Sequence, residues 1–372
     1  MKQASGRTGL IRLIRQAIEE SGALPFDQYM KLCLYHDRYG YYHSPKPKIG
    51  REGDFYTSSY VGSVMGEMLA AFLLRHGWGR SGRLHVVEWG GGTGRMARHV
   101  LDALQKEDAA VYDRLLYHCV EESPSHRRLQ ADECRNHLEK MQWLGEQEFL
   151  QEASALEEPV VLFSNELLDA FPVKRAVCRD GTWKEVFVGW DDRRGAFFEV
   201  EQTPEKELAD YLDAHGVKGE DGQRMEANLA GLAWFVRTAG ALPPGSWMIS
   251  IDYGDVREAL WSGYRRNGTF RCYHRHRVHD DPYVHVGEQD MTAHVNFSDF
   301  MEAGERAGLE TVRYCTQKEF LLAAGILDRL VHSGVQDPFH PDARRNRAIR
   351  QLLLDDSMGE SFKVLIQQKR GG

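Results

Sequence analysis

The stretch Glu88-Trp-Gly-Gly-Gly-Thr-Gly94 combines a carboxylate with four closely spaced glycines. An apolar run precedes it and apolar residues at helical spacing follow it, which predicts a strand, a tight turn and a helix. Glycine lets the chain turn sharply and lets a ligand approach the backbone. The amides at the start of the helix favour negative or electron-rich ligand atoms. This stretch therefore indicates a cofactor site at the end of a strand.

The glycines fit two cofactor patterns. Gly92-Thr-Gly-Arg-Met-Ala97 matches the dinucleotide pattern G-x-G-x-x-G/A, which favours an NAD-linked oxidoreductase. Glu88, Gly90, Gly92 and Gly94 match the acid-x-G-x-G-x-G pattern of S-adenosylmethionine (SAM) methyltransferases, in which the acid can face the cationic methionine end of the ligand. A glycine-rich connection without a ligand is the third interpretation, and the pattern alone leaves all three open.

A second carboxylate, Glu121, follows the predicted strand Leu115–Val120. An acid at this distance beyond the glycine turn is placed to accept hydrogen bonds from ribose hydroxyls. The alternative is a charge at the start of the helix that Ser123-Pro124 opens. The glycine turn favours the ribose role.

Three polar residues follow the buried run Pro159–Ser164, namely Asn165, Glu166 and Asp169. Ligands of open α/β sheets bind beyond the carboxyl ends of the strands, so these side chains are expected to face the same crevice as the glycine turn. Two carboxylates three residues apart can hold a planar guanidinium and increase the electron density of its nitrogen. Alternatively, Asp169 caps a helix and Glu166 bonds to the backbone.

Elements that position these groups extend along the whole chain of 372 residues. Residues 1–80 are predicted to form N-terminal helices and a long loop rich in aromatic residues and glycine. Residues 81–372 are predicted to form a Rossmann-like α/β sheet with an insertion at about 174–243 that contains β-hairpins and two helices, the second at Arg224–Ala239. Asp54 and Thr57 are the candidate cofactor-binding groups of the long loop, since loops of this length are often functional.

Composition limits the classes of partner. The net charge of −8 argues against a general nucleic-acid surface, because phosphate binding normally needs a basic face. Six widely spaced cysteines disfavour a zinc site or a disulfide framework and suit a reducing cytoplasm. No apolar run is long enough for a membrane span. The histidines between Gly268 and Phe297 lack the spacing of a metal-binding helix, so no metal is predicted.

Several motifs in one order resemble the MidA family of SAM-dependent methyltransferases. They are Tyr39–Tyr42, Gly53–Ser58, Glu88–Gly94, Val120–Pro124, Asn165–Pro172, Ile251–Gly254, Gly268-Thr269 and Gln289–Val295. The chain departs from the usual pattern at Gly91, His99, Leu167 and Phe171, but none of these is a proposed ligand group. The resemblance implies a SAM-binding Rossmann-like fold.

Mitochondrial members of this family are protein arginine methyltransferases needed for assembly of respiratory complex I. The resemblance therefore implies SAM as cofactor and a protein substrate, such as a respiratory complex subunit, that is methylated on arginine beside Glu166 and Asp169. A homodimer is a further expectation. The rival hypothesis is an assembly factor or binding module that uses the same fold with little turnover, since a fold does not establish activity.

Overall fold

The computed structural model describes residues 3–44, 62–78, 82–331, 337–354 and 359–371. It divides into two compact units, each made from three stretches of the chain. The accessory unit contains residues 1–55, 169–233 and 255–298. The sheet unit contains residues 56–168, 234–254 and 299–372.

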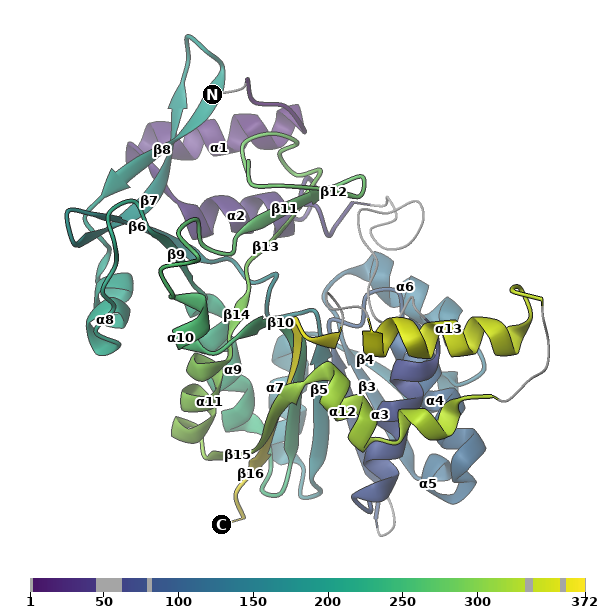
Figure 1. The fold of residues 1–372 in the computed structure, drawn as a ribbon. Helices are drawn as coiled ribbons and strands as arrows, with labels where there is room; N and C mark the ends of the chain where they lie inside the picture. Colours follow the sequence, from purple (N-terminus) through teal and green to yellow (C-terminus); the bar gives the residue numbers. More distant parts are fainter. Residues whose placement is uncertain (1–2, 45–61, 79–81, 332–336, 355–358, 372) are drawn as a thin grey trace. The chain divides into compact units, whose positions relative to one another are not determined.

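The sheet unit is built on strands in the order β15-β16-β10-β5-β2-β3-β4. Figure 1 shows this sheet with its neighbouring helices. Their bounds are β2 Leu84–Trp89, β3 Leu115–Val120, β4 Met141–Leu144, β5 Val160–Asn165, β10 Trp247–Asp255, β15 Leu309–Thr316 and β16 Phe362–Lys369. The pairs from β10 to β4 are parallel, whereas β16 pairs antiparallel with both β10 and β15. This is the open α/β sheet expected from the sequence.

The strand order reverses beside β2. The chain passes from β2 outward to β3 and β4, and then returns to β5 on the other side of β2. Such a topological switch point leaves a crevice beyond the carboxyl ends of the two strands, where open α/β folds bind their ligands.

Helices accompany the strands of the sheet unit, and all of those named next except α6 bury apolar side chains. They are α3 Val64–Arg75, α4 Arg95–Glu107, α5 Ala109–Asp113, α6 Pro124–Glu133, α7 Glu146–Ala155, α12 Gln317–Ala323 and α13 Pro341–Leu354, with short 3-10 turns at Leu138–Lys140 and Ile326–Arg329. In α4, Met96, Val100 and Leu104 recur every four residues and are buried in one core with the strands. Two further helices, α9 Leu229–Ala241 and α11 Phe297–Arg306, include residues of both units.

An antiparallel sheet forms the centre of the accessory unit. Its strands are β1 Leu24–Pro25, β6 Lys174–Arg179, β7 Thr182–Asp191, β8 Ala196–Gln202 and β9 Arg224–Ala227, accompanied by helices α1 Thr8–Ser21, α2 Phe26–Tyr35, α8 Lys206–Ala214 and α10 Arg257–Leu260. A three-stranded sheet contains β11 Arg271–His274, β12 Arg277–His279 and β13 Asp290–Thr292, and a short strand β14 covers Val295–Asn296. The expected hairpins are present. Asp180 and Gly181 both have positive φ between β6 and β7, as a two-residue hairpin turn requires.

One predicted helix begins too early. The helix expected over Arg224–Ala239 is wrong at its start, because Arg224–Ala227 forms strand β9 and pairs antiparallel with β6. Met225 and Ala227 alternate into the core of the accessory unit, which is the period of a strand. The helix itself is α9, and the side chain of Asn228 accepts a hydrogen bond from Gly231 N at 2.9 Å near its start.

Candidate active site at the switch point

The glycine turn joins β2 directly to α4. Gly90, Gly92 and Gly94 have φ values of 72°, 53° and 84°, in the left-handed region that favours glycine. Gly90 N donates to Val120 O at 3.1 Å, and Gly94 N donates to Gly91 O at 2.9 Å. The expected strand, tight turn and helix are therefore all present, and α4 begins directly after Gly94.

Neighbouring groups pack so closely on the turn that side chains would not fit. A Cβ on Gly91 would lie 2.8 Å from the carboxyl carbon of Glu88, and one on Gly90 would lie 2.9 Å from Leu167 Cδ1. A Cβ on Gly94 would lie 2.8 Å from the Cα of Gln130. The turn thus forms a narrow backbone cradle packed against the ends of β2 and β5 and helix α6, and these three positions require glycine because protein atoms occupy the place of a side chain.

Glu88 lies buried beneath this cradle, with a side chain 3% exposed. Tyr117 donates its hydroxyl proton to Glu88 Oε2 at 2.8 Å. The pKa of Glu88 is raised to about 7, mainly because the carboxyl is buried; the Tyr117 hydrogen bond lowers the pKa, and the nearby charge of Glu121 contributes to raising it. A cationic ligand near this carboxylate would favour its ionised form, which matches the charge of the methionine end of SAM.

Glu121 is held at the end of β3 by groups of its own chain. Its Oε1 accepts a hydrogen bond from Ser123 N at 2.8 Å, and its Oε2 lies 3.4 Å from both Gln130 Nε2 and His126 Nδ1. The side chain is only 10% exposed. The carboxylate therefore takes part in the start of α6, as the helix-charge interpretation expects, while its second oxygen remains close to the turn through Gln130.

Gln130 is a site residue that sequence reasoning missed. It is fully buried, donates from Nε2 to Gly92 O at 3.1 Å, and accepts at Oε1 from Trp143 Nε1 at 2.9 Å. One side chain thus connects the glycine turn with α6 and β4. The sequence offered little sign of this role, because the partners of Gln130, Gly92 and Trp143, are distant from it along the chain. The one available signal was a side-chain amide at an inward position of α6.

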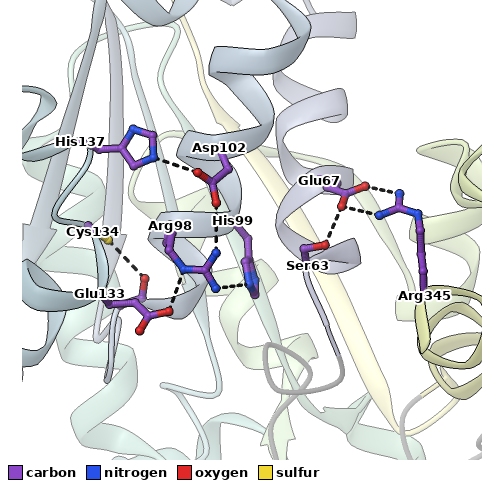
Figure 2. Close-up of polar contacts among 10 residues, drawn as sticks. Ser63, Glu67, Arg98, His99, Asp102, Glu133, Cys134, His137 and Arg345 are labelled. Carbon is purple, nitrogen blue, oxygen red and sulfur yellow. Dashed lines mark hydrogen bonds and ion pairs between the residues drawn. The ribbon is translucent and has the colours of Figure 1, made fainter. Parts of the chain in front are cut away.

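A polar network anchors the helix that follows the turn (Figure 2). Arg98 on α4 pairs with Glu133 on α6 at 2.7 Å and with Asp102 at 3.1 Å. Asp102 in turn contacts His137 Nε2 at 3.0 Å. Cys134 Sγ donates to Gly94 O at 3.4 Å, so the network reaches the first turn of α4. These contacts fix α4 against α6 and thereby fix the direction of the turn.

Glu166 occupies a second turn, at the end of β5. It has a φ of 53°, which is uncommon for a residue other than glycine. Its N–H donates to Ile251 O at 2.9 Å, and its Oε1 accepts from Asn165 Nδ2 at 3.0 Å. Strand β5 pairs with β2 so that Ser164 lies beside Trp89. The Glu166 turn is therefore the immediate neighbour of the glycine turn, as the Gly90–Leu167 distance also indicates.

Asp252 was also missed as a site residue, although it lies within a motif that the sequence analysis quoted. It is 1% exposed and accepts at Oδ2 from the N–H groups of Leu167 and Leu168 at 3.1 and 2.7 Å. Its side chain thus binds the two amides that follow Glu166. Only the parallel pairing of β10 with β5 brings these segments together.

Asp169 belongs to the accessory unit, where it is buried. Tyr42 of the same unit donates to Asp290 Oδ1 at 2.8 Å. Burial raises the pKa of Tyr42 well above its usual value, and the negative charges of Asp290 and Asp169 contribute to this shift. Since Glu166 belongs to the sheet unit, the pairing of Glu166 with Asp169 stays a prediction.

Asp54 and Thr57, the candidates of the long loop, lie outside the described residues. Among the described residues, none of the histidines between Gly268 and Phe297 belongs to a group of three side chains that could hold a metal ion. His274 and His285 instead stack on each other with ring centroids 3.9 Å apart. No helix within the described ranges is both long and apolar enough to cross a membrane.

Comparison with known proteins identifies the family. Residues 65–315 match the family described as "Putative S-adenosyl-L-methionine-dependent methyltransferase". The chain belongs to this MidA family of methyltransferases. A Burkholderia thailandensis protein described as a "likely methyl transferase", with bound S-adenosyl-homocysteine, is 32% identical, with a TM-score of 0.86 over 97% of this chain and 92% of that one.

Curated relatives of this MidA family member carry a more specific name. A protein arginine methyltransferase NDUFAF7 homolog, mitochondrial, from Drosophila melanogaster is 29% identical over 82% of this chain and 72% of its own length. The Homo sapiens protein arginine methyltransferase NDUFAF7, mitochondrial, is 24% identical over 98% of this chain and 81% of its own length.

The cofactor of this MidA family member is SAM. Of the two glycine patterns, the one that starts at Glu88 therefore applies, and the dinucleotide interpretation of Gly92–Ala97 is wrong. The buried acid beneath the turn is the local feature that distinguishes them, since the dinucleotide pattern does not include Glu88.

Proposed function

We propose that this chain transfers a methyl group from SAM to an arginine side chain of a protein substrate. The observation that carries the proposal is the contact between the two turns at the switch point, one with the glycines and one with Glu166. A carboxylate is thereby available at the edge of the sheet where a methyl donor and its acceptor must meet. The names of the relatives from Drosophila melanogaster and Homo sapiens support arginine as the acceptor.

The proposed cofactor-binding residues surround the glycine turn. They are Glu88, Gly90, Gly92, Gly94, Glu121 and Asn165, together with Asp54 and Thr57 of the long loop. When bound, SAM supplies an electrophilic methyl group on a sulfonium. The backbone of the glycine turn would receive the cofactor, Glu88 would balance its positive charge, and Glu121 would accept hydrogen bonds from ribose hydroxyls. Methyl transfer depends mainly on such positioning and electrostatics.

The acceptor side chain would be held by carboxylates. Glu166 and Asp169 suit a guanidinium because a carboxylate can accept two parallel N–H bonds from its planar fork. Their negative charge also increases the electron density on the attacking nitrogen. Asn165 supports this role, since its amide donates to Glu166 Oε1 and limits the rotation of the carboxylate.

The first prediction tests Glu166 with a variant that keeps its shape. In Glu166→Gln, SAM affinity measured by calorimetry should stay within about twofold of the parent value. Transfer of radiolabelled methyl to a cognate protein should fall by about 100-fold or more, because the charge of Glu166 acts mainly in the transition state. Glu158→Gln is the matched control, since Glu158 is exposed just before the opposite end of β5.

Other outcomes of this experiment have defined meanings. Full activity of Glu166→Gln on a verified substrate would reject the arginine mechanism. Loss of SAM binding would assign Glu166 to the cofactor site instead. Tight SAM binding by the parent chain without methyl transfer to any protein of its host would favour the rival hypothesis of an assembly factor or binding module.

Further expectations concern partners and compartment. The six cysteines are free and buried, which suits the reducing cytoplasm proposed for the chain, although the relatives named above are mitochondrial. The proposed partner is a protein with an accessible arginine, such as a respiratory complex subunit, and a homodimer stays a prediction.

A further inference from the structure

The turn that carries Glu166 has a backbone conformation that its own sequence does not favour. A φ of 53° places Glu166 in the left-handed region, where a side chain with a Cβ is crowded by the backbone. Such conformations persist only where surrounding contacts hold them, and they often occur at functional sites. Here strand β10 supplies such contacts.

Asp252 binds backbone amides of the turn with its side chain. Its Oδ2 accepts from Leu167 N at 3.1 Å and from Leu168 N at 2.7 Å, and its Oδ1 accepts from Tyr253 N at 2.8 Å. The carboxylate is 1% exposed, so water does not compete effectively for these amides. One buried acid thus binds the two peptide groups that leave Glu166.

Backbone pairing aligns Asp252 with the turn. Strands β10 and β5 are parallel, with Ile251 beside Asn165, so the next residues are Asp252 on β10 and Glu166 directly after the end of β5. Ile251 O accepts from Glu166 N at 2.9 Å, which fixes the peptide that enters the turn. Asp252 then fixes the peptides that leave it. Glu166 is therefore constrained on both sides by β10.

We propose that Asp252 is a positioning residue for methyl transfer, which acts by holding the Glu166 turn in its left-handed conformation and so directing the Glu166 carboxylate at the acceptor nitrogen. This inference rests on the role of Glu166 proposed above. Asp252 needs no contact with the substrate or the cofactor for this role.

The first test is Asp252→Asn. The amide oxygen can still accept from Leu167 and Leu168, but the amide nitrogen would then face Tyr253 N, a second donor. We expect SAM affinity to stay within about twofold and kcat to fall by about 10- to 100-fold, since small displacements of reacting groups have effects of this size. The control is Asp255→Asn. Asp255 lies on the same strand as Asp252, but its side chain accepts from Val256 N and from neither Leu167 nor Leu168. An Asp252→Asn variant with the kcat of the parent would overturn the inference.

The second test measures the conformation without activity. Glycine adopts a φ of 53° without strain, so in a Glu166→Gly background the turn should depend less on Asp252. We expect Asp252→Asn to lower the melting temperature of the parent chain by several degrees and to lower that of Glu166→Gly by clearly less. Equal shifts in the two backgrounds would overturn the inference. Should Asp252→Asn fail to fold, the double variant with Glu166→Gly should fold again. A double variant that also fails to fold would overturn the inference.

These tests separate the inference from the proposed function. If Glu166→Gln keeps full methyl transfer, the role of Glu166 is rejected whatever Asp252 does. If Glu166→Gln is inactive and Asp252→Asn is fully active, the proposed function stands and the positioning role is rejected. The inference requires the two residues to act as one unit. In that case Asp252→Asn lowers kcat in the parent chain, but adding it to Glu166→Gln does not lower kcat by the same factor again.

Discussion

At the scale of single residues, Glu88 determines how the cofactor site responds to pH. Burial raises its pKa from a usual value of 4.5 to about 7. Between these two values the folded chain binds a proton that the unfolded chain releases. The contribution of Glu88 to the free energy of unfolding is therefore largest below pH 4.5 and declines as the pH rises to 7.

The second prediction follows from this shift. Between pH 4.5 and 7 the parent chain should lose about 3 kcal/mol of unfolding free energy relative to Glu88→Gln, since one pKa unit corresponds to about 1.4 kcal/mol. Urea unfolding of both proteins across this range measures the difference. Parallel pH profiles for the two would show that Glu88 is not buried in a neutral form.

The third prediction concerns ligand binding to the same residue. If Glu88 balances the positive charge of SAM, binding should favour ionised Glu88, so affinity should rise from pH 6 to pH 8 and protons should be released on binding. Calorimetry in buffers with different heats of ionisation measures the released protons. The Glu88→Gln variant should show neither effect. If the pH dependence of SAM affinity is the same in that variant as in the parent, another group causes the pH dependence.

At the scale of elements, the glycine turn depends on how tightly α4 and α6 pack. Gly94 combines a positive φ with a close approach to Gln130, and the network of Arg98, Glu133 and Asp102 holds the same two helices together (Figure 2). A side chain at this position must therefore displace a helix and cannot simply rotate away.

The fourth prediction compares two glycines with similar positive φ values. Gly94→Ala should lower the free energy of unfolding by at least about 1 kcal/mol more than Gly82→Ala, because overpacking adds to the cost of the positive φ. Gly82 has a φ of 76° and no atom within 4 Å of the place that a Cβ would occupy, so it isolates the backbone cost. Urea unfolding measures both, and equal losses would show that α6 yields easily. SAM affinity should fall only in Gly94→Ala.

At the scale of the whole molecule, each unit is assembled from segments that are far apart in sequence. In the accessory unit, Lys174 on β6 is 4% exposed and contacts Glu185 at 2.8 Å, Glu205 at 2.8 Å and Asp27 at 3.5 Å. Asp27 lies on α2, near the start of the chain. One buried cation therefore connects the N-terminal helices with the hairpins that follow β5.

The fifth prediction tests this connection. Lys174→Met should lower the free energy of unfolding by about 3–5 kcal/mol, because Glu185 is fully buried and would lose its counter-charge. Lys206→Met is the control, since Lys206 is 88% exposed and its pair with Asp210 should contribute at most about 1 kcal/mol. A similar, small loss in both variants would mean that the accessory unit tolerates an unpaired Glu185.

Sequence alone determined the features that depend on local chemistry. The run Leu115–Val120 is a strand with the predicted bounds, and the glycines at positions 90 to 94 form the predicted turn, because apolar periodicity and positive φ are properties of a few consecutive residues. The order of motifs also predicted the family and its cofactor, since each motif adds a separate constraint.

Only the tertiary structure decided the features that depend on which segments pair. Arg224–Ala227 became a strand because β6 offered it a partner, although its residues are compatible with a helix. Gln130 and Asp252 bind turns that lie 38 and 84 to 85 residues away, and no local pattern encodes such contacts. Strand order determines these contacts, because the positions of β3 beside β2 and of β10 beside β5 follow from burial over the whole sheet.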